Sequence, residues 1–374
     1  MPSQKKQIIL NRNEVLQGPS PRAIAAMHNF PSSRANLYFP GYYGSLLAPE
    51  LSKKFGVPAD RIIVGYGAED ILRRVFDTLD PSRDTALFNE LHFDFYHIYL
   101  AGRGVRFHEF RLIEGEKEFS FDVDECIAKI REFSPRLVLI TSPNNPTGNT
   151  LSAKDLARIL KAAPARCIVA VDEAYYGFDA DYEEKEFLAL LRRHGNLMFI
   201  RTFSKLYALA GLRIGYALCG KDVRAMLGHQ HHRLGGSRIL EEIAVAALRS
   251  PAYYRALSKE IARERAGAVR SVNALTHFRA FASRGNMFTV KVSPAAKAFL
   301  EKEMARAPRL VSKFYSPTLL RVSVAPKEIM EEFMAMMARV DRKAAAMRPA
   351  PARPKARKTT TRAPRIRRTV RYRA

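Results

Sequence analysis

The sequence predicts an α/β fold: a mostly parallel seven-stranded sheet covered by helices, with a second, smaller α+β unit. First, the chain has 374 residues, too many for one small core. Second, short apolar runs alternate with segments of helical period up to Leu218. Third, the pattern then changes to long, charged helical segments and a few further apolar runs. Strands that alternate with helices are typical of a parallel sheet covered on both faces.

The elements follow in a regular order along the chain. The first 45 residues look irregular apart from a short helix near residues 22–27, and a helix is predicted over 47–55. The predicted strands of the large sheet are 62–64, 85–88, 105–107, 137–140, 168–171, 197–200 and 214–218. Helices lie between most of them, and the apolar residues of the first share one face: Ile71, Leu72, Val75, Phe76 and Leu79.

The remaining elements form the smaller unit. One long, charged helix is predicted over 241–272. Strands near 287–292 and 319–324 and a helix near 328–340 follow it. We therefore expect four parts, which are an N-terminal arm belonging partly to the small domain (1–45), a large domain (46–260), a small domain (261–345) and a disordered basic tail (346–374).

The net charge of +25 is concentrated at the C-terminus. From Arg348 onward there are eleven Arg or Lys and no acidic residue, with many Pro, Ala and Thr. Such a segment buries too little apolar surface to offset its ordering entropy. We expect a solvated extension without a specific partner. The alternative is that the segment contacts nucleic acid or another polyanion weakly through phosphate neutralisation.

Cysteine use and hydropathy exclude several classes of protein. Cys126, Cys167 and Cys219 are widely spaced and odd in number, so they indicate neither a disulfide framework nor a metal site. They favour a reducing compartment, and we expect a cytoplasmic protein without a metal. No apolar run is long enough for a signal peptide at the N-terminus or for a membrane span.

Polar motifs follow three of the predicted strands. Residues 142–148 read Ser-Pro-Asn-Asn-Pro-Thr-Gly, residues 172–175 read Asp-Glu-Ala-Tyr, and Lys205 follows the strand at 197–200. Ligands of parallel sheets collect at the carboxyl ends of strands, where all three motifs lie. A turn alone would explain the first motif. Its position beside the other two favours a binding site.

Two residues of these motifs have distinctive chemistry. A lysine after Phe-Ser is most often solvated, but Lys205 lies between an apolar strand and an Ala/Leu/Gly stretch. A partly desolvated lysine has a lowered pKa and can bond covalently to an aldehyde. Asp172 ends a buried strand, where a carboxylate is costly unless it caps a loop or pairs with a cation.

The same region offers donors for an anion. Arg213 could bind a phosphate bidentately, and the hydroxyls of Thr202 and Ser204 could donate to it. Gly67, Ala68 and Glu69 lie between a strand and an amphipathic helix, where backbone N–H groups would face the anion.

In this order and spacing, the motifs resemble the cofactor site of the fold-type I aminotransferases, which depend on pyridoxal 5'-phosphate (PLP). Within these, the histidinol-phosphate aminotransferase branch is the most similar. The resemblance extends from about Leu10 to Val340 and includes Asn13-Glu14 and the Gly-Pro-Ser-Pro run at 18–21. It implies catalytic roles for Lys205, Asp172 and Tyr175. It implies that PLP is bound by Lys205, Asn145, Asp172, Tyr175, Thr202, Ser204, Arg213, Gly67, Ala68, Glu69 and Phe93.

The resemblance also assigns individual tasks. Lys205 would hold PLP and shuttle a proton, and Asp172 would pair with the pyridine nitrogen. Tyr175 and Asn145 would bind the phenolic oxygen, and Phe93 would cover the ring. Substrate contacts are implied for Arg321, Asn13, Tyr38 and Asn286, with Arg321 binding the carboxylate of glutamate or 2-oxoglutarate. A structural ion pair is the alternative for Arg321, since a buried arginine needs an anionic partner.

The sequence departs from the family pattern near the substrate. Phe39 stands where a tyrosine usually reaches the neighbouring subunit's cofactor phosphate, so Tyr38 or Tyr42 would have to substitute for it. Residues 232–237 lack the usual Pro-aromatic-Asn, and the stretch between Phe288 and Arg321 is short. The site at 67–70 has Glu-Asp where the family usually has Asp-Glu.

These observations predict a homodimeric aminotransferase that acts on a small-molecule amino donor and a 2-oxo acid. The donor would be histidinol phosphate or a related aromatic or phosphorylated amine. A PLP-dependent decarboxylase of a phosphorylated amino acid, such as threonine phosphate, is the alternative. A third possibility is a domain of this fold that the basic tail tethers to nucleic acid. No membrane partner is expected.

Overall fold

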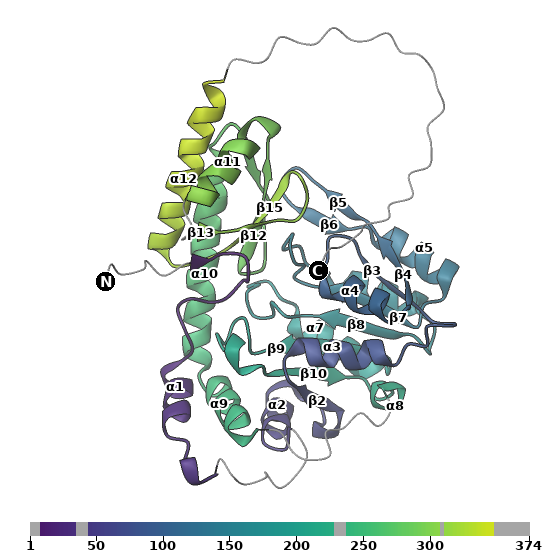
Figure 1. Cartoon of the computed structure of the whole chain (residues 1–374). Helices are drawn as coiled ribbons and strands as arrows, with labels where there is room; N and C mark the ends of the chain where they lie inside the picture. Colours follow the sequence, from purple (N-terminus) through teal and green to yellow (C-terminus); the bar gives the residue numbers. More distant parts are fainter. Residues whose placement is uncertain (1–7, 35–43, 228–236, 307–309, 348–374) are drawn as a thin grey trace, which may run out of the picture.

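The computed structural model describes residues 8–34, 44–227, 237–306 and 310–347, and its largest element is a seven-stranded sheet (Figure 1). The strand order is β2-β10-β9-β8-β7-β3-β4. The bounds are β2 (Ile62–Gly65), β3 (Thr85–Asn89), β4 (Arg106–Phe110), β7 (Leu137–Thr141), β8 (Ile168–Asp172), β9 (Leu197–Thr202) and β10 (Gly215–Cys219). Only β10 runs antiparallel to its neighbours within this sheet. The predicted mostly parallel sheet is confirmed.

Helices cover both faces of this sheet. One face, which we call the α4 face, carries α3 (Ala68–Asp77), α4 (Phe95–Gly102) and α8 (Val223–Leu227). The other carries α2 (Leu47–Phe55), α5 (Val123–Phe133), α6 (Ala153–Ala162) and α7 (Glu184–Arg193). Successive strand side chains alternate between the faces, so Leu137 and Leu139 pack on the α4 face and Val138 and Ile140 on the other.

Capping residues explain where several helices begin. The side chains of Asp122 and Ser152 accept hydrogen bonds from the first turns of α5 and α6. At α3 the N-cap is Gly67, with φ +85°, and no side chain caps this end. The N-terminus of α3 is therefore open to an external hydrogen-bond acceptor.

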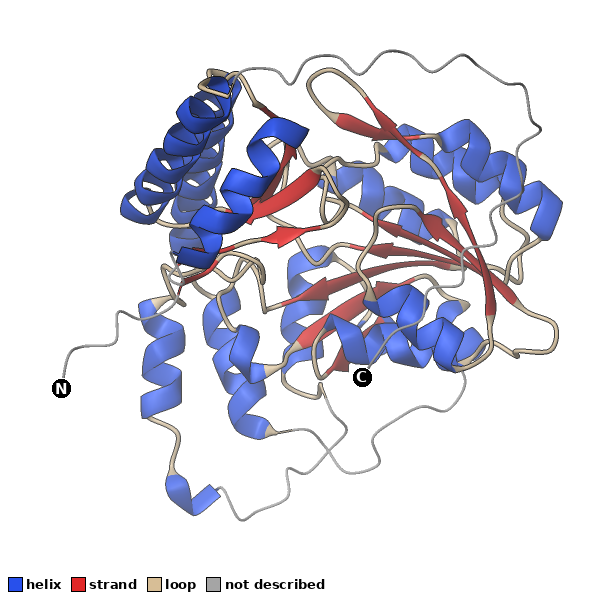
Figure 2. Cartoon of the chain, turned by 45° about the horizontal axis from the view of Figure 1, so that its top comes forward, coloured by secondary structure: helices blue, strands red, loops and turns tan. Residues whose placement is uncertain are grey.

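The second unit is built on a four-stranded antiparallel sheet of order β11-β12-β15-β14 (Figure 2). Its strands are β11 (Phe278–Ala280), β12 (Met287–Val292), β14 (Lys313–Phe314) and β15 (Leu319–Ser323). Its helices are α10 (Pro251–Asn273), α11 (Pro294–Arg306) and α12 (Lys327–Ala345). At the start of the chain, β1 (Ile8–Ile9) pairs in parallel with β13 (Leu310–Val311), which brings the N-terminal arm to this unit.

The prediction of one continuous helix over 241–272 is wrong. The structure has α9 (Arg238–Leu248) and α10, separated at Arg249 and Ser250. Pro251 opens α10 because it has no N–H to donate, and it disfavours helical geometry at the residue before it. The predicted domain boundary at 260 falls inside α10, and the division into domains stays a prediction.

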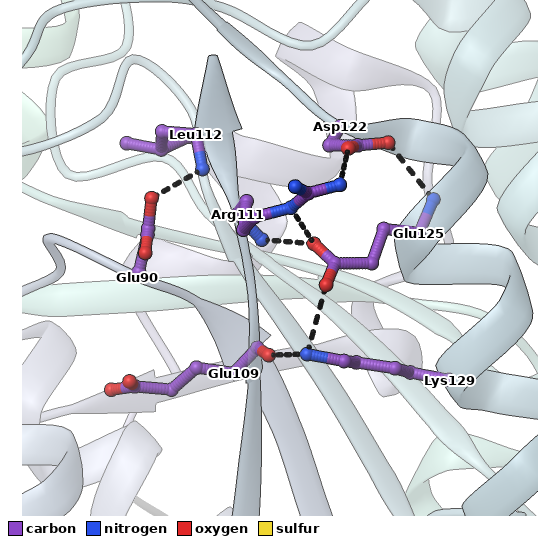
Figure 3. A network of polar contacts seen from close by, with 7 residues as sticks. All are labelled: Glu90, Glu109, Arg111, Leu112, Asp122, Glu125 and Lys129. Atoms are coloured by element: carbon purple, nitrogen blue, oxygen red, sulfur yellow. Dashed lines mark hydrogen bonds and ion pairs between the residues drawn. The ribbon is translucent and has the colours of Figure 1, made fainter. Parts of the chain in front are cut away.

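A hairpin of β5 (Leu112–Glu114) and β6 (Phe119–Phe121) joins the two units. Figure 3 shows its base, where Arg111 donates to the carboxylates of Asp122 and Glu125 and Lys129 pairs with Glu125. At its other end Glu114 pairs with two cations of the small sheet, which are Arg279 and Lys291.

The remaining elements are short. They are α1 (Pro21–His28) and the 3-10 helices η1 (Ser32–Arg34), η2 (Ala59–Arg61) and η3 (Ala210–Leu212). Cys126, Cys167 and Cys219 are all buried and free. In the ranges described, none of the helices has the length and apolar character needed to cross a membrane.

Candidate active site

The candidate site is a cavity of about 320 Å³ at the carboxyl ends of the central strands. Thr141, Asp172 and Thr202 end β7, β8 and β9, and strand alternation directs them to the α4 face. The predicted residues that line the cavity are Ala68, Glu69, Phe93, Asn145, Asp172, Tyr175, Thr202, Ser204, Lys205, Arg213 and Arg321. Residues far apart in sequence therefore meet at the expected edge of the sheet.

Asp172 lies at the floor of the cavity with its side chain 4% exposed. One carboxylate oxygen accepts from the backbone N–H of Ala174 (3.0 Å) and the other from the Tyr96 hydroxyl (2.5 Å). Burial raises the pKa of Asp172 to about 6, while these two hydrogen bonds act in the opposite direction. A buried carboxylate of this kind would gain from a cationic partner inside the cavity.

Lys205 lies three residues beyond the end of β9, and its Nζ donates to the backbone oxygen of Arg12 (2.8 Å). The same Nζ lies 5.7 Å from the centre of the Tyr175 ring. Burial, followed by the positive charge of Arg321, lowers the pKa of Lys205 to about 8. A sizeable fraction of this amine is therefore neutral and nucleophilic near neutral pH.

One corner of the cavity gathers donors for an anion. Arg213 Nη1 lies 3.4 Å from the Ser204 hydroxyl, which in turn lies 3.0 Å from that of Thr202. A Cβ at residue 67 would lie 2.8 Å from Arg213 Nη2, so the glycine lets this guanidinium approach the N-terminus of α3. The N-terminus of α3, the two hydroxyl groups and the guanidinium group could together bind a phosphate group.

The loop after β7 is held by hydrogen bonds around Asn144, which is fully buried. Its side-chain amide donates to the backbone oxygen of Leu91 (3.0 Å) and to the Thr147 hydroxyl (2.7 Å). The neighbouring Asn145 then points into the cavity, where its Oδ1 accepts from Arg321 (2.5 Å). The hydrogen bonds of Asn144 therefore fix the position of Asn145, which is one of the predicted site residues.

Arg321 projects from β15 toward the cavity and is 4% exposed. Its guanidinium donates to Asn145, to the Tyr315 hydroxyl (2.6 Å) and to the backbone oxygen of Asn11. Its Nε has no hydrogen-bond partner, and its guanidinium forms no ion pair with a carboxylate among the described residues. The structural ion pair considered for this residue is therefore absent among the described residues, and a buried guanidinium without a counter-ion favours an anionic ligand.

Asn13 and Asn286 support the cavity wall from behind. Neither lines the cavity. Asn286 donates to the backbone oxygen of Asn13 (2.9 Å), and Asn13 Nδ2 donates to the Tyr175 hydroxyl (2.8 Å). Burial raises the pKa of Tyr175 to about 12, so its hydroxyl keeps its proton.

Other predicted residues have more peripheral positions. Gly67 contributes its backbone at the N-cap of α3, and Phe93 forms part of the wall with 38% of its side chain exposed. Tyr38, Phe39, Tyr42 and residues 232–236 lie outside the described residues.

Tyr96, Lys313 and Tyr315 are among the residues at or beside the cavity that the sequence interpretation missed. Tyr96 donates to Asp172, and a tyrosine on an apolar helix face could have indicated such a buried partner. Lys313 and Tyr315 line the cavity from the small unit, and Lys313 pairs with Asp94 (2.5 Å). No local signal marks these two, because the short β14 depends on pairing with β15.

The chemical groups that the side chains present to the cavity are those that PLP requires. An amine, a buried carboxylate and a phosphate-type corner match the aldehyde, the pyridine nitrogen and the phosphate of PLP. Within the described ranges there is no cluster of three or more His, Cys, Asp or Glu that could hold a metal ion.

Comparison with known proteins agrees with this chemistry. Residues 5–336 match the family described as aminotransferase class I and II. Histidinol-phosphate aminotransferase 1 of Cupriavidus pinatubonensis is 31% identical over 324 residues, which is 85% of this chain and 82% of that protein.

Solved structures share the fold. The histidinol-phosphate aminotransferase of Sinorhizobium meliloti in complex with PLP has a TM-score of 0.77 at 22% identity, covering 90% of this chain and 91% of that one. The L-threonine-O-3-phosphate decarboxylase of Porphyromonas gingivalis has a TM-score of 0.72 at 17% identity, covering 89% and 98%. By sequence and by fold, this chain belongs to the class I and II aminotransferases and is a PLP-dependent enzyme of that family.

Proposed function

We propose that this enzyme moves an amino group from histidinol phosphate, or a related aromatic or phosphorylated amine or amino acid, to a 2-oxo acid such as 2-oxoglutarate. One observation carries the proposal. The buried Arg321 guanidinium, which has no carboxylate partner among the described residues, faces the same cavity as the Lys205 amine. A carboxylate bound to Arg321 would hold an amino or oxo carbon near that amine.

The proposed cofactor contacts follow the geometry of the cavity. When bound, PLP supplies an aldehyde that bonds to amines and a ring that accepts electrons. Asp172 would hold the pyridine nitrogen in its protonated form, and Tyr175 and Asn145 would hold the ring oxygen. The phosphate would be held by the first turn of α3, with the backbone of Gly67, Ala68 and Glu69, and by the side chains of Thr202, Ser204 and Arg213. Phe93 would cover one face of the ring.

Lys205 acts as both attachment point and base. With a pKa near 8 its amine can bond to the aldehyde and, once released by the substrate, accept the proton of the substrate Cα. The Lys205 Nζ would then carry that proton. Arg321 would hold the carboxylate of the 2-oxo acid in the second half of the reaction, because histidinol phosphate itself has no carboxylate.

The donor is proposed from two observations. The relative from Cupriavidus pinatubonensis is a histidinol-phosphate aminotransferase and covers most of this chain. Lys313 adds a further cation to the residues that line the cavity, and a donor phosphate could replace its present partner, Asp94. Both observations favour a phosphorylated donor over an uncharged one.

A half-reaction with single donors tests the proposal. We expect histidinol phosphate, without any 2-oxo acid, to convert the visible absorbance band of the bound cofactor to that of pyridoxamine phosphate. Lys205→Ala should abolish this conversion, whereas Lys221→Ala, an exposed lysine in the loop after β10, should leave it unchanged.

Each other outcome revises the proposal in a defined way. Conversion by an aromatic amino acid alone would replace the donor and keep the reaction. Failure of every donor, with carbon dioxide released from threonine phosphate, would replace the aminotransferase by the decarboxylase. Conversion by the Lys205→Ala variant at the wild-type rate would overturn the assignment of Lys205.

Three further expectations belong to the same proposal. The enzyme acts as a homodimer, with Tyr38 or Tyr42 in place of the missing tyrosine at the cofactor of the neighbouring subunit. The basic tail makes at most weak contacts with polyanions. The three free, buried cysteines support a cytoplasmic location.

A further inference from the structure

Tyr96 lies directly beneath Asp172, on the α4 face of the sheet. Its hydroxyl is 2.5 Å from Asp172 Oδ2 and 3.0 Å from Thr141 Oγ1. We infer that Tyr96 is a positioning residue that keeps Asp172 ionised and aimed at the pyridine nitrogen of the cofactor. This inference rests on the proposed role of Asp172.

The direction of the hydrogen bonds is fixed by chemistry. An ionised carboxylate can only accept, so the Tyr96 proton must point to Asp172. The Tyr96 oxygen is then free to accept the Thr141 hydroxyl proton. Thr141 and Asp172 end adjacent parallel strands and are paired in register, so the sheet itself places both partners of Tyr96.

The Tyr96 ring is held rigidly and cannot exchange its partners for water. It has no exposed surface, and it packs against four aromatic side chains, of which Phe93 lies edge-on at 6.0 Å. The His92 ring is stacked on it at 5.4 Å with an interplanar angle of 13°, and Phe76 and Phe88 lie edge-on at 6.1 Å. A locked donor orients its acceptor as well as stabilising its charge.

The other charged and titratable groups around Asp172 cannot replace this donor. Lys205, from the loop after β9, lowers the pKa of Asp172, but it is the residue proposed to bond to the cofactor aldehyde. Glu173 raises that pKa, and its own carboxylate pairs with Arg201 on the other face of the sheet (2.7 Å). Tyr175 donates no hydrogen bond to Asp172.

Loss of the Tyr96 hydroxyl should therefore protonate Asp172 at neutral pH. Burial already raises the pKa of this carboxyl to about 6, and the Tyr96 hydrogen bond is one of two that oppose the rise. A protonated Asp172 cannot stabilise a positive charge on the pyridine nitrogen. Cofactor binding should then weaken near neutral pH and recover as the pH rises and Asp172 ionises.

The test compares Tyr96→Phe with Tyr99→Phe on the same helix. Tyr99 donates to Asp77 (2.9 Å) and neither residue lines the cavity, so Tyr99→Phe controls for loss of a tyrosine hydroxyl from α4. PLP dissociation constants of the purified chain are measured by equilibrium dialysis from pH 6.5 to 9. We expect Tyr96→Phe to bind PLP at least about tenfold more weakly at pH 7, with the deficit shrinking toward pH 9. Tyr99→Phe should match the wild type throughout.

Two outcomes would overturn the inference. Wild-type affinity of Tyr96→Phe at every pH would show that the hydroxyl is dispensable. A loss that is the same at every pH would indicate a merely structural role. The variant Asp172→Asn distinguishes an error about Tyr96 from an error about the proposed function. If Asp172→Asn binds PLP with wild-type affinity, the proposed role of Asp172 is wrong. If Asp172→Asn binds PLP weakly and Tyr96→Phe binds it normally, only the role of Tyr96 is wrong.

Discussion

Two buried arginines show how the surroundings of a residue distinguish a structural role from a ligand-binding role. Arg201 is 1% exposed, pairs with Glu173 and lies 3.6 Å from the centre of the Tyr176 ring. Its charge is compensated within the fold, which suits a structural residue. Arg321 is also buried, but only neutral acceptors surround it in the described structure. The sequence shows an arginine in an apolar strand in both cases and cannot distinguish them.

At this scale we predict that Arg321→Ala raises the Michaelis constant for the 2-oxo acid by about 10- to 100-fold, because charge-assisted hydrogen bonds to the carboxylate are lost. The dissociation constant of PLP should change by no more than about twofold, since Arg321 is not among the proposed phosphate ligands. Steady-state kinetics and PLP titration measure the two quantities. Arg284→Ala, which removes an ion pair with Asp179, is the control. An unchanged Michaelis constant in Arg321→Ala would refute the assignment.

At the scale of elements, the strands of the large sheet could be predicted because each is an apolar run between polar turns. All seven are present within two residues of the predicted bounds at their starts. The break between α9 and α10 follows from a single proline and could have been read from Pro251. By contrast, β5, β6 and β14 are only two or three residues long and depend on their pairing partners.

The N-terminus of α3 provides the prediction at this scale. Gly67→Ala should weaken PLP binding by about tenfold, because a Cβ there meets Arg213 Nη2 at 2.8 Å and φ is +85°. Gly102→Ala in α4 is the matched control, since its Cβ would meet nothing within 4 Å. Equilibrium dialysis with PLP and with inorganic phosphate as competitor measures the effect. Equal affinities for the two variants would remove the α3 end from the proposed phosphate site.

At the scale of the whole molecule, the N-terminal segment connects the two units at the cavity. Arg12 accepts from Lys205 and Asn11 from Arg321 through their backbone oxygens. Asn13 joins Tyr175 of the large unit to Ser323 of the small sheet. The sequence could suggest that Asn13 belongs to the site by resemblance. It could not reveal these contacts, which join residues 162 and 310 positions apart and depend on the packing of the two units.

Charge is the other property of the whole molecule, and it leads to a prediction about the tail. The eleven Arg and Lys residues from Arg348 onward follow the last residue of the predicted site in the sequence. Removing them should therefore leave catalysis unchanged. A chain truncated after Ala346 should keep wild-type turnover. It should also remain a dimer, with a mass by light scattering that is twice that of one truncated chain. Only the full chain should bind duplex DNA at 50 mM salt, and 200 mM salt should abolish this binding as condensed counterions compete. Equal DNA binding by the two forms would locate the polyanion contact in the folded part, and a loss of dimer mass on truncation would make the tail part of the assembly.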